Sequence, residues 1–382
     1  MSKMKELAAI AIAFCVLPFA GAAADDAPIR IGSFVAVTGQ GAFLGDPSKK
    51  VLEHFVAETN GSGGVDGRKI ELVLYDSRTD AKEAVNFVRR LTIQDKVDLI
   101  IGGNTTGETM AVIPFVEQAG IPFISLAGGS VVIDPVKPLV FKTVHTDRIS
   151  VESILDHAKA EAQSKVAVLS GPGGFDQSCR TNLVDLIDDY NITLVADEQH
   201  GAGDTDMTAQ MTNIRAAAPD LMVYCGFGAP SSIVAKNHKQ LIASIPLYMT
   251  VGAASQDFIN GAAGAAEGVY VTGSAVMVAD LLRDDDPQAA VSRAFIASYR
   301  KAFGEDPSSF AGHAYDAFIL AIDAIKRAGG TDPKALRDAI EATNGLPGIN
   351  GVYQLSATDH MGLGPRSLIL TRVENGRFVP AD

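Results

Sequence analysis

The sequence contains no tryptophan, only three cysteines, and no long apolar run after its first two dozen residues. A membrane-spanning helix needs about 20 consecutive apolar residues, so the chain beyond residue 24 is expected to be soluble. Positive charge is also in deficit, with 32 Lys and Arg against 45 Asp and Glu. Nucleic acid is therefore not expected as a partner, because neutralising phosphates requires clusters of Lys and Arg.

Residues 1–24 have the pattern of a secretory signal. Two lysines precede an apolar run over residues 7–20, and three alanines follow it. The run is too short to cross a bilayer, so it predicts export to the periplasm and removal of the segment. Cys15 lies inside it, but Phe14 is too bulky for the small residue of a lipoprotein signal, which favours full release over a lipid anchor.

Two cysteines remain beyond this segment, Cys179 and Cys225. In an oxidising compartment they could pair, but two thiols so far apart in sequence are equally compatible with separate buried side chains.

His313 and Asp316 stand three residues apart in a helical pattern and raise the question of a metal site. Without a third ligand at metal spacing, packing and capping are the favoured roles, and no metal is expected.

From residue 28 to about residue 270, short β-branched runs alternate with longer amphipathic stretches. Such βαβα alternation predicts α/β architecture with parallel sheets covered on both faces by helices. A chain of 382 residues can bury the cores of two domains. The predicted strands are 29–37, 69–76, 97–103, 121–127, 166–171, 192–198, 220–226 and 245–251, with helices such as 81–93 and 207–218 between them.

The second half of this region repeats the first. Four pairs of segments match in the same order: 38–45 with 170–177, 69–80 with 192–206, 98–103 with 220–226, and 121–130 with 245–255. The repeat predicts two similar doubly wound halves in series. From about residue 274 the chain becomes helical over 286–304, 308–330 and 332–343, followed by a strand pattern at 351–357 and a hairpin turning at Asn375–Gly376.

The glycine-rich loop TGQGAFLG, residues 38–45, lies where a dinucleotide-binding loop would follow the first strand. Asp76 closes the next strand, as that interpretation requires. However, no tyrosine is followed by a lysine four residues later, as in short-chain dehydrogenases, and no cofactor is expected. A second interpretation is that these glycines only form a tight turn into a helix.

A third interpretation follows from the repeat. Ligands in open α/β sheets collect outside the carboxyl ends of the strands, and the glycine-rich loops of both halves occupy matching places there. Thr105 and Thr106 precede a helical stretch whose free amides would accept an anion. Phe43, Leu44, Phe175 and Phe227 would form apolar walls, and residues 127–129 leave the backbone open to a ligand. The loops predict a cleft between two domains.

Over nearly all of its length beyond the signal, the chain resembles type I periplasmic solute-binding proteins of ABC transporters, in the branched-chain amino acid branch. The motifs that carry the resemblance are VTGQGAFLGD, NGSGGVDGRKIELVLYDSRTD, LIIGGNTTGETMAVIPFVEQAGIPFIS, AAGAAEGVYVTG and FGEDPSSFAGHAYDAFILAIDAIKRAG. The resemblance implies two lobes, residues 25–147 with 275–350 and residues 148–274 with 351–382. Three crossings would join them, and the lobes would close on a small ligand.

The resemblance also implies which residues bind the ligand. In amino-acid-binding members, a hydroxyl matching Thr106 and the loop matching Ala127, Gly128 and Gly129 hold the ligand carboxylate. A threonine often stands where this chain has Gly129. Residues matching Leu44, Phe175 and Phe227 line the rest of the ligand site. Thr105 and Gly252 complete the set of residues that we expect to bind the ligand. The acid that pairs with the ligand ammonium should fall at Val251 or Gly252, and neither is acidic.

An ammonium buried without a counter-charge would cost several kcal/mol. We therefore expect an aromatic or other apolar carboxylate in preference to a branched-chain amino acid, which remains the alternative. His145 or Arg148, near the first crossing, could reach a second polar group of the ligand, although a solvated hinge face explains them equally well.

No nucleophile with its base, carboxylate pair or metal cluster stands out, so the chain is not expected to be an enzyme. The expected partners are ABC permease subunits in the membrane, and the chain is expected to be a monomer. The same fold also serves in ligand-sensing proteins that act on membrane receptors, and this is the alternative from another class.

Overall fold

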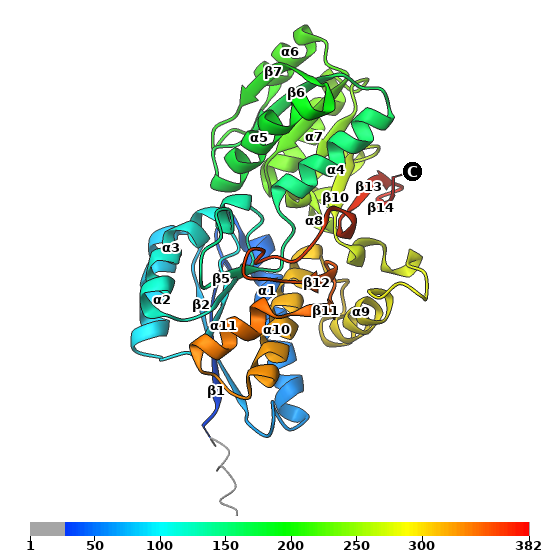
Figure 1. Ribbon diagram of the computed structural model, residues 1–382. Helices are drawn as coiled ribbons and strands as arrows, with labels where there is room; N and C mark the ends of the chain where they lie inside the picture. The colour runs from blue at the N-terminus through cyan, green and yellow to red at the C-terminus, as the bar shows by residue number, and fades with distance from the viewer. Residues whose placement is uncertain (1–26, 382) are drawn as a thin grey trace, which may run out of the picture.

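The computed structural model describes residues 27–381, and the predicted signal lies outside them. The described chain forms two lobes, each built around its own sheet (Figure 1). The first sheet is parallel with strand order β2-β1-β3-β4-β5. Its elements are β1 (Ile29–Val35), α1 (Ala42–Gly61), β2 (Ile70–Asp76), α2 (Ala81–Ile93), β3 (Leu99–Gly102), α3 (Thr106–Ala119), β4 (Phe123–Ser125) and β5 (Val140–Lys142).

The second sheet has the order β7-β6-β8-β9-β10 and is extended by the antiparallel pair β13-β14. Its five parallel strands occur in the same order as those of the first sheet, so the structure confirms the predicted repeat. The elements are α4 (Asp147–Ala160), β6 (Lys165–Ser170), α5 (Gly174–Leu186), β7 (Thr193–Gln199), α6 (Thr208–Ala217), β8 (Leu221–Cys225), α7 (Ala229–Leu241), β9 (Leu247–Met249), α8 (Gln256–Ala262), β10 (Tyr270–Gly273), β13 (Ile369–Glu374) and β14 (Arg377–Pro380).

All eight predicted strand segments form strands. The inner strands are buried between helices, as their β-branched runs indicate, whereas β2 and β7 lie at sheet edges and are half-buried. The predicted hairpin is also present: β13 and β14 pair antiparallel, and Asn375 and Gly376 have positive φ. Strands β5 and β10 were not among the predicted strands.

The C-terminal helices pack against the first lobe, although they follow the second in sequence. They are α9 (Ala289–Phe303), α10 (Ser309–Ala328) and α11 (Pro333–Glu341). Side chains of α10 share a buried core with those of α1 and β1, and the two helices lie side by side in Figure 1. A short sheet of β11 (Asn344–Pro347) and β12 (Val352–Gln354) follows. The predicted lobe boundaries lie after the first residue of α4, between β10 and α9, and between the paired strands β11 and β12. They stay a prediction.

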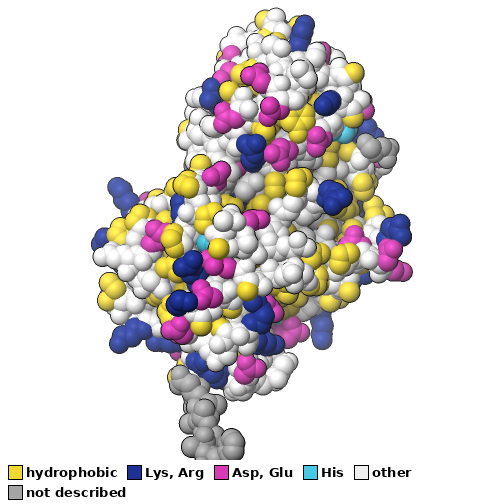
Figure 2. All heavy atoms as spheres, in the orientation of Figure 1, with side chains coloured by type: hydrophobic (Ala, Val, Ile, Leu, Met, Phe, Trp, Pro, Cys, Tyr) yellow, Lys and Arg dark blue, Asp and Glu magenta, His cyan; other side chains and the backbone are white. Residues whose placement is uncertain are grey.

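The surface carries charges of both signs without a broad basic area on the face shown in Figure 2. Positive and negative side chains alternate over both lobes, as a net charge of −13 spread over the whole chain allows. Within residues 27–381, no helix combines the length and apolarity needed to cross a membrane.

Cys179 and Cys225 form a disulfide that joins α5 to the end of β8, with their Cα atoms 5.6 Å apart. The sequence had left pairing and separate thiols equally open. Because the bond closes a loop of 46 residues, reducing it should lower the free energy of unfolding by about 2–4 kcal/mol. Denaturant melts with and without reductant measure this, and a Cys179→Ser/Cys225→Ser variant should no longer respond to reductant. An unchanged midpoint in fully reduced protein would contradict the expectation.

Candidate functional site

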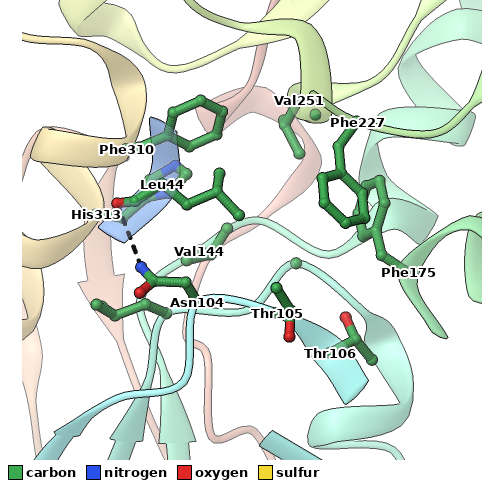
Figure 3. Close-up of a pocket in the computed structure, with 13 residues that line it drawn as sticks. Leu44, Asn104, Thr105, Thr106, Val144, Phe175, Phe227, Val251, Phe310 and His313 are labelled. Carbon is green, nitrogen blue, oxygen red and sulfur yellow. Dashed lines mark hydrogen bonds between the residues drawn. The ribbon is translucent and has the colours of Figure 1, made fainter. Parts of the chain in front are cut away.

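The carboxyl ends of strands from both sheets border a cavity between the lobes, as the repeat predicted. About 390 Å³ lies between protein atoms there, part of it open to solvent. The lining residues are Leu44, Asn104, Thr105, Thr106, Leu126, Gly128, Val144, Phe175, Phe227, Val251, Gly252, Phe310 and His313. Figure 3 shows Leu44 and Phe310 on one side of this space and Phe175 and Phe227 on the other, with the two threonines at its base.

The two threonines at the start of α3 have different roles. Thr105 is the N-cap: its hydroxyl accepts from the Glu108 N–H, and the Glu108 carboxylate accepts the Thr105 N–H, which forms a capping box. The Thr105 hydroxyl also donates to this carboxylate. Its oxygen points away from the cavity in Figure 3. The Thr106 Oγ1 accepts the N–H of Gly129 at 3.1 Å and points toward Phe175. The Thr106 O–H finds no protein acceptor within residues 27–381, so it can donate to a ligand.

The loop after β4 passes close behind Thr106. A Cβ at Gly129 would lie 2.7 Å from the Thr106 Oγ1, and one at Gly128 would lie 2.8 Å from the Phe175 ring. A threonine at position 129 would therefore require the Thr106 side chain to shift. Glycine at both positions lets the hydroxyl and the ring approach the loop.

Aromatic side chains from the two lobes contact one another at the cavity. The rings of Phe175 and Phe227 meet edge to face with centroids 6.2 Å apart, and Phe43 from the first lobe lies 6.2 Å from Phe227. Phe43 also packs edge to face on Phe310 at 5.4 Å. The cavity is thus closed by direct contact between residues of the two lobes.

The loop after β9 supplies an apolar lining and no charge. Val251 is 4 % exposed and lines the cavity. A Cβ at Gly252 would lie 2.4 Å from the carbonyl oxygen of Gly226, so no side chain fits there without a shift. An acid at this loop could enter the cavity only from position 251.

Of the ten residues predicted for the site, seven line the cavity, and Ala127, Gly129 and His145 do not. Ala127 and Gly129 belong to the loop behind Thr106. His145 is fully buried and its Nε2 lies 3.0 Å from the Ser367 hydroxyl, so the structure places it away from the cavity. Arg148, the other candidate for a second polar group, pairs with Glu152 on the surface of α4 at 3.1 Å.

Six lining residues were not among those predicted: Asn104, Leu126, Val144, Val251, Phe310 and His313. Phe310 and His313 come from the first turn and a half of α10, more than 200 positions after Thr106. No local sequence pattern predicts that they line the cavity. His313 was noted in the sequence only beside Asp316. Asp316 instead accepts four hydrogen bonds inside the first lobe, and no group of metal-binding side chains is found among residues 27–381.

Burial sets the charges around the cavity. Burial, with Lys142 and His145 nearby, lowers the pKa of His313 to about 3, so its ring is neutral at physiological pH. Burial likewise lowers the pKa of His145 to about 4, with Lys142 adding to the effect. Lys142 is fully buried behind residues 127–129, and this burial lowers its pKa to about 7 although Asp147 opposes the shift.

Hydrogen bonds also cross between the lobes next to the cavity. The Ser130 hydroxyl, after β4, lies 3.2 Å from the Ser178 hydroxyl on α5. Asn182 on the same helix donates to Ser130 Oγ at 2.9 Å and to an Asp147 carboxylate oxygen at 3.0 Å. These contacts hold the two lobes together in a closed arrangement.

Comparison with known proteins gives a consistent result. A family model described as periplasmic binding protein matches residues 28–377. The chain is 25% identical to Leu/Ile/Val-binding protein homolog 7 of Brucella suis, covering 89% of this chain and 86% of the relative. It is 24% identical to a leucine-, isoleucine-, valine-, threonine- and alanine-binding protein of Pseudomonas aeruginosa, covering 88% of each. Among solved structures, an extracellular ligand-binding receptor from Rhodopseudomonas palustris superposes with a TM-score of 0.87 at 25% identity, over 93% of this chain and 99% of that one.

Proposed function

The chain belongs to the periplasmic binding protein family, in its branched-chain amino acid ABC transporter type, and on that premise we propose that it captures an apolar or aromatic carboxylate that carries no α-amino group. Its relatives are substrate-binding proteins and not enzymes. The observation that carries the proposal is a Thr106 hydroxyl at the start of α3 that, among residues 27–381, is free to donate into a cavity lined by no acidic side chain.

The absence of a counter-charge for an ammonium supports this ligand class. None of the thirteen lining side chains of the described chain is acidic. Glu108, the nearest acid in sequence to Thr106, is 1 % exposed and holds the Thr105 cap. An α-ammonium enclosed here would lose its hydration without gaining a partner, at a cost of several kcal/mol.

His313 supports a second polar group on the ligand. Its neutral imidazole lines the cavity beside Phe310, with the two rings 5.7 Å apart. A neutral imidazole can donate or accept one hydrogen bond, and the rest of the lining is mostly apolar. A ring hydroxyl or keto oxygen would satisfy it, which suits hydroxybenzoates, phenylpropanoid acids and 2-oxo acids. His313 takes the role that the sequence had offered to His145 or Arg148.

Capture works by closure and not by chemistry. The first lobe supplies Thr106 and Leu44, and the second supplies Phe175 and Phe227, so a ligand gains contacts from both only when they meet. Binding therefore shifts the population toward the closed form. The closed form would deliver the ligand to ABC permease subunits as a monomer, with the lobes divided at the predicted boundaries.

A thermal-shift screen tests the ligand class. The panel contains benzoate, 4-hydroxybenzoate, 4-hydroxycinnamate, 4-methyl-2-oxopentanoate, L-leucine and L-valine, and intrinsic fluorescence is avoided because the chain has no tryptophan. Stabilisation by one or more of the aminoless acids and not by the amino acids is the expected result. Stabilisation by leucine or valine alone would overturn the proposal in favour of a branched-chain amino acid, which is what the named relatives bind.

Replacing Thr106 by Val should weaken carboxylate binding by about 1–3 kcal/mol, because the hydroxyl proposed to donate to the carboxylate is lost. Isothermal titration with the best ligand of the screen measures the change. Thr105→Val is the comparison: its hydroxyl is engaged by Glu108, so it should mainly lower the free energy of unfolding, by about 1 kcal/mol. Equal affinity in Thr106→Val and wild type would show that the carboxylate binds elsewhere.

A further inference from the structure

A buried positive charge lies directly behind the carboxylate end of the cavity. Lys142, the last residue of β5, is fully buried, and its Nζ donates to the carbonyl oxygens of Gly128 at 3.0 Å and Gly129 at 3.2 Å. The side chain does not line the cavity. A lysine completely removed from water is rare, and an apolar residue would fill the same space without the cost of desolvation.

The hydrogen bonds lead from this ammonium to the ligand site in three steps. Lys142 donates to the Gly128 carbonyl oxygen. The N–H on the other side of the same peptide group, that of Gly129, donates to the Thr106 Oγ1 at 3.1 Å. The Thr106 O–H is then left to donate into the cavity. Each donor in such a chain strengthens the next, because hydrogen bonds in a low-dielectric interior polarise one another.

We propose that Lys142 is a positioning residue that polarises the Thr106 hydroxyl through the Gly128–Gly129 peptide group, so that a buried charge stabilises the bound carboxylate without touching it. This inference rests on the proposed function only in placing a carboxylate at Thr106, and an amino acid ligand would share that group.

The charged and titratable groups around Lys142 determine the pH range in which its ammonium can stabilise the bound carboxylate. Asp147 at the start of α4 is the acid facing it, and its own carboxylate is held by the Ser130 N–H and Asn182. His145 and His313 also face Lys142. With pKa values of about 4 and 3, both are neutral above pH 6 and do not change charge with Lys142.

The pH dependence has a definite sign. In the ligand-free protein the pKa of Lys142 is about 7, and a carboxylate anion at Thr106 favours the charged lysine and raises that pKa. Below pH 6 the lysine is charged with or without ligand, so affinity is constant. Above about pH 7 the free protein has lost the proton and binding must restore it, so affinity falls by up to about tenfold per pH unit.

Titration calorimetry with benzoate and with L-leucine, from about pH 6 to 8.5, tests the inference. The carboxylates of both probes and the leucine ammonium keep their charge over most of this range. Running each titration in two buffers of different ionisation enthalpy gives the number of protons taken up. For whichever probe binds, wild type should take up close to one proton near pH 8.

Three variants separate polarisation from simple packing. Lys142→Met should bind at least about tenfold more weakly at pH 6 and show neither the pH slope nor the proton uptake. Lys142→Arg should retain binding and lose the slope, since arginine stays charged. Lys137→Met is the matched control: that lysine also donates to two carbonyl oxygens near this loop, Val131 and Pro135, and its loss should leave affinity and slope unchanged.

The outcomes distinguish this inference from the proposed function. A pH slope and proton uptake that persist in folded Lys142→Met would overturn the role of Lys142 whichever probe binds. Leucine binding with the expected slope would overturn the proposed ligand class and support Lys142. If neither probe nor any carboxylate of the screen binds, both proposals fail.

Discussion

Replacing Val251 by Glu is expected to weaken binding of benzoate or a related aminoless acid by at least about 100-fold. Val251 is buried at the cavity wall, so a carboxylate there would share an enclosed space with the ligand carboxylate. Like charges brought together in this way cost several kcal/mol. The same variant should gain affinity for L-leucine, because the new carboxylate can pair with its ammonium. Titration of both ligands against wild type and variant measures the two changes.

Val251→Gln is the matched control for this substitution. It adds nearly the same volume without charge, so it separates crowding of the cavity from electrostatic repulsion. It should weaken benzoate binding less than Val251→Glu and should not gain affinity for leucine. Equal losses in the two variants would show that position 251 acts only through its size, and the argument from the missing counter-charge would not hold.

Replacing Asp316 by Ala is expected to lower the free energy of unfolding by about 3–5 kcal/mol. Asp316 is fully buried on α10. Its two oxygens accept the N–H groups of Ile349 and Asn350, the Asn350 amide and the Tyr353 hydroxyl at 2.7–2.8 Å. Removing the carboxylate leaves these donors buried without acceptors, next to the segment where the chain returns to the second lobe. Urea denaturation measures the loss.

Asp323→Ala provides the comparison on the same helix. Asp323 lies two turns further along α10 and pairs with Arg327 near the surface, where an ion pair contributes only about 0–1 kcal/mol. A loss for Asp316→Ala no larger than that for Asp323→Ala would show that the buried hydrogen bonds contribute little net stability.

The parts of the site that the sequence predicted are those that recur in both halves of the repeat. Thr106, Phe175 and Phe227 stand just after strand patterns at matching positions, and the carboxyl ends of parallel strands lie on one edge of a sheet. The spacing therefore placed them near a ligand before any contact was known. Phe310 and His313 lie on a helix outside the repeat, and their place in the cavity depends on how α10 packs on the first lobe.

In the sequence, Lys142 stands out only as a single charged residue in the apolar run LVFKTV. The groups to which it donates hydrogen bonds could not be predicted from that pattern. The two carbonyl oxygens it reaches belong to a loop thirteen and fourteen positions earlier. His145, three residues further on, offered the more obvious chemistry in the sequence, yet it is directed to Ser367 in the C-terminal segment. Which of these two polar residues lies behind Gly128 and Gly129 depends on how the segment after β4 packs on β5, which the local pattern does not show.

By itself the sequence determined the α/β class, the duplicated sheets, most of the loops that line the cavity and the absence of an acid at Val251 and Gly252, because these follow from periodicity, repeats and residue type. Only the tertiary structure decided that Cys179 and Cys225 pair, that the Thr106 hydroxyl and not that of Thr105 faces the cavity, and that α10 closes one wall. Those features depend on distances between segments far apart in the chain, which packing sets and local pattern does not.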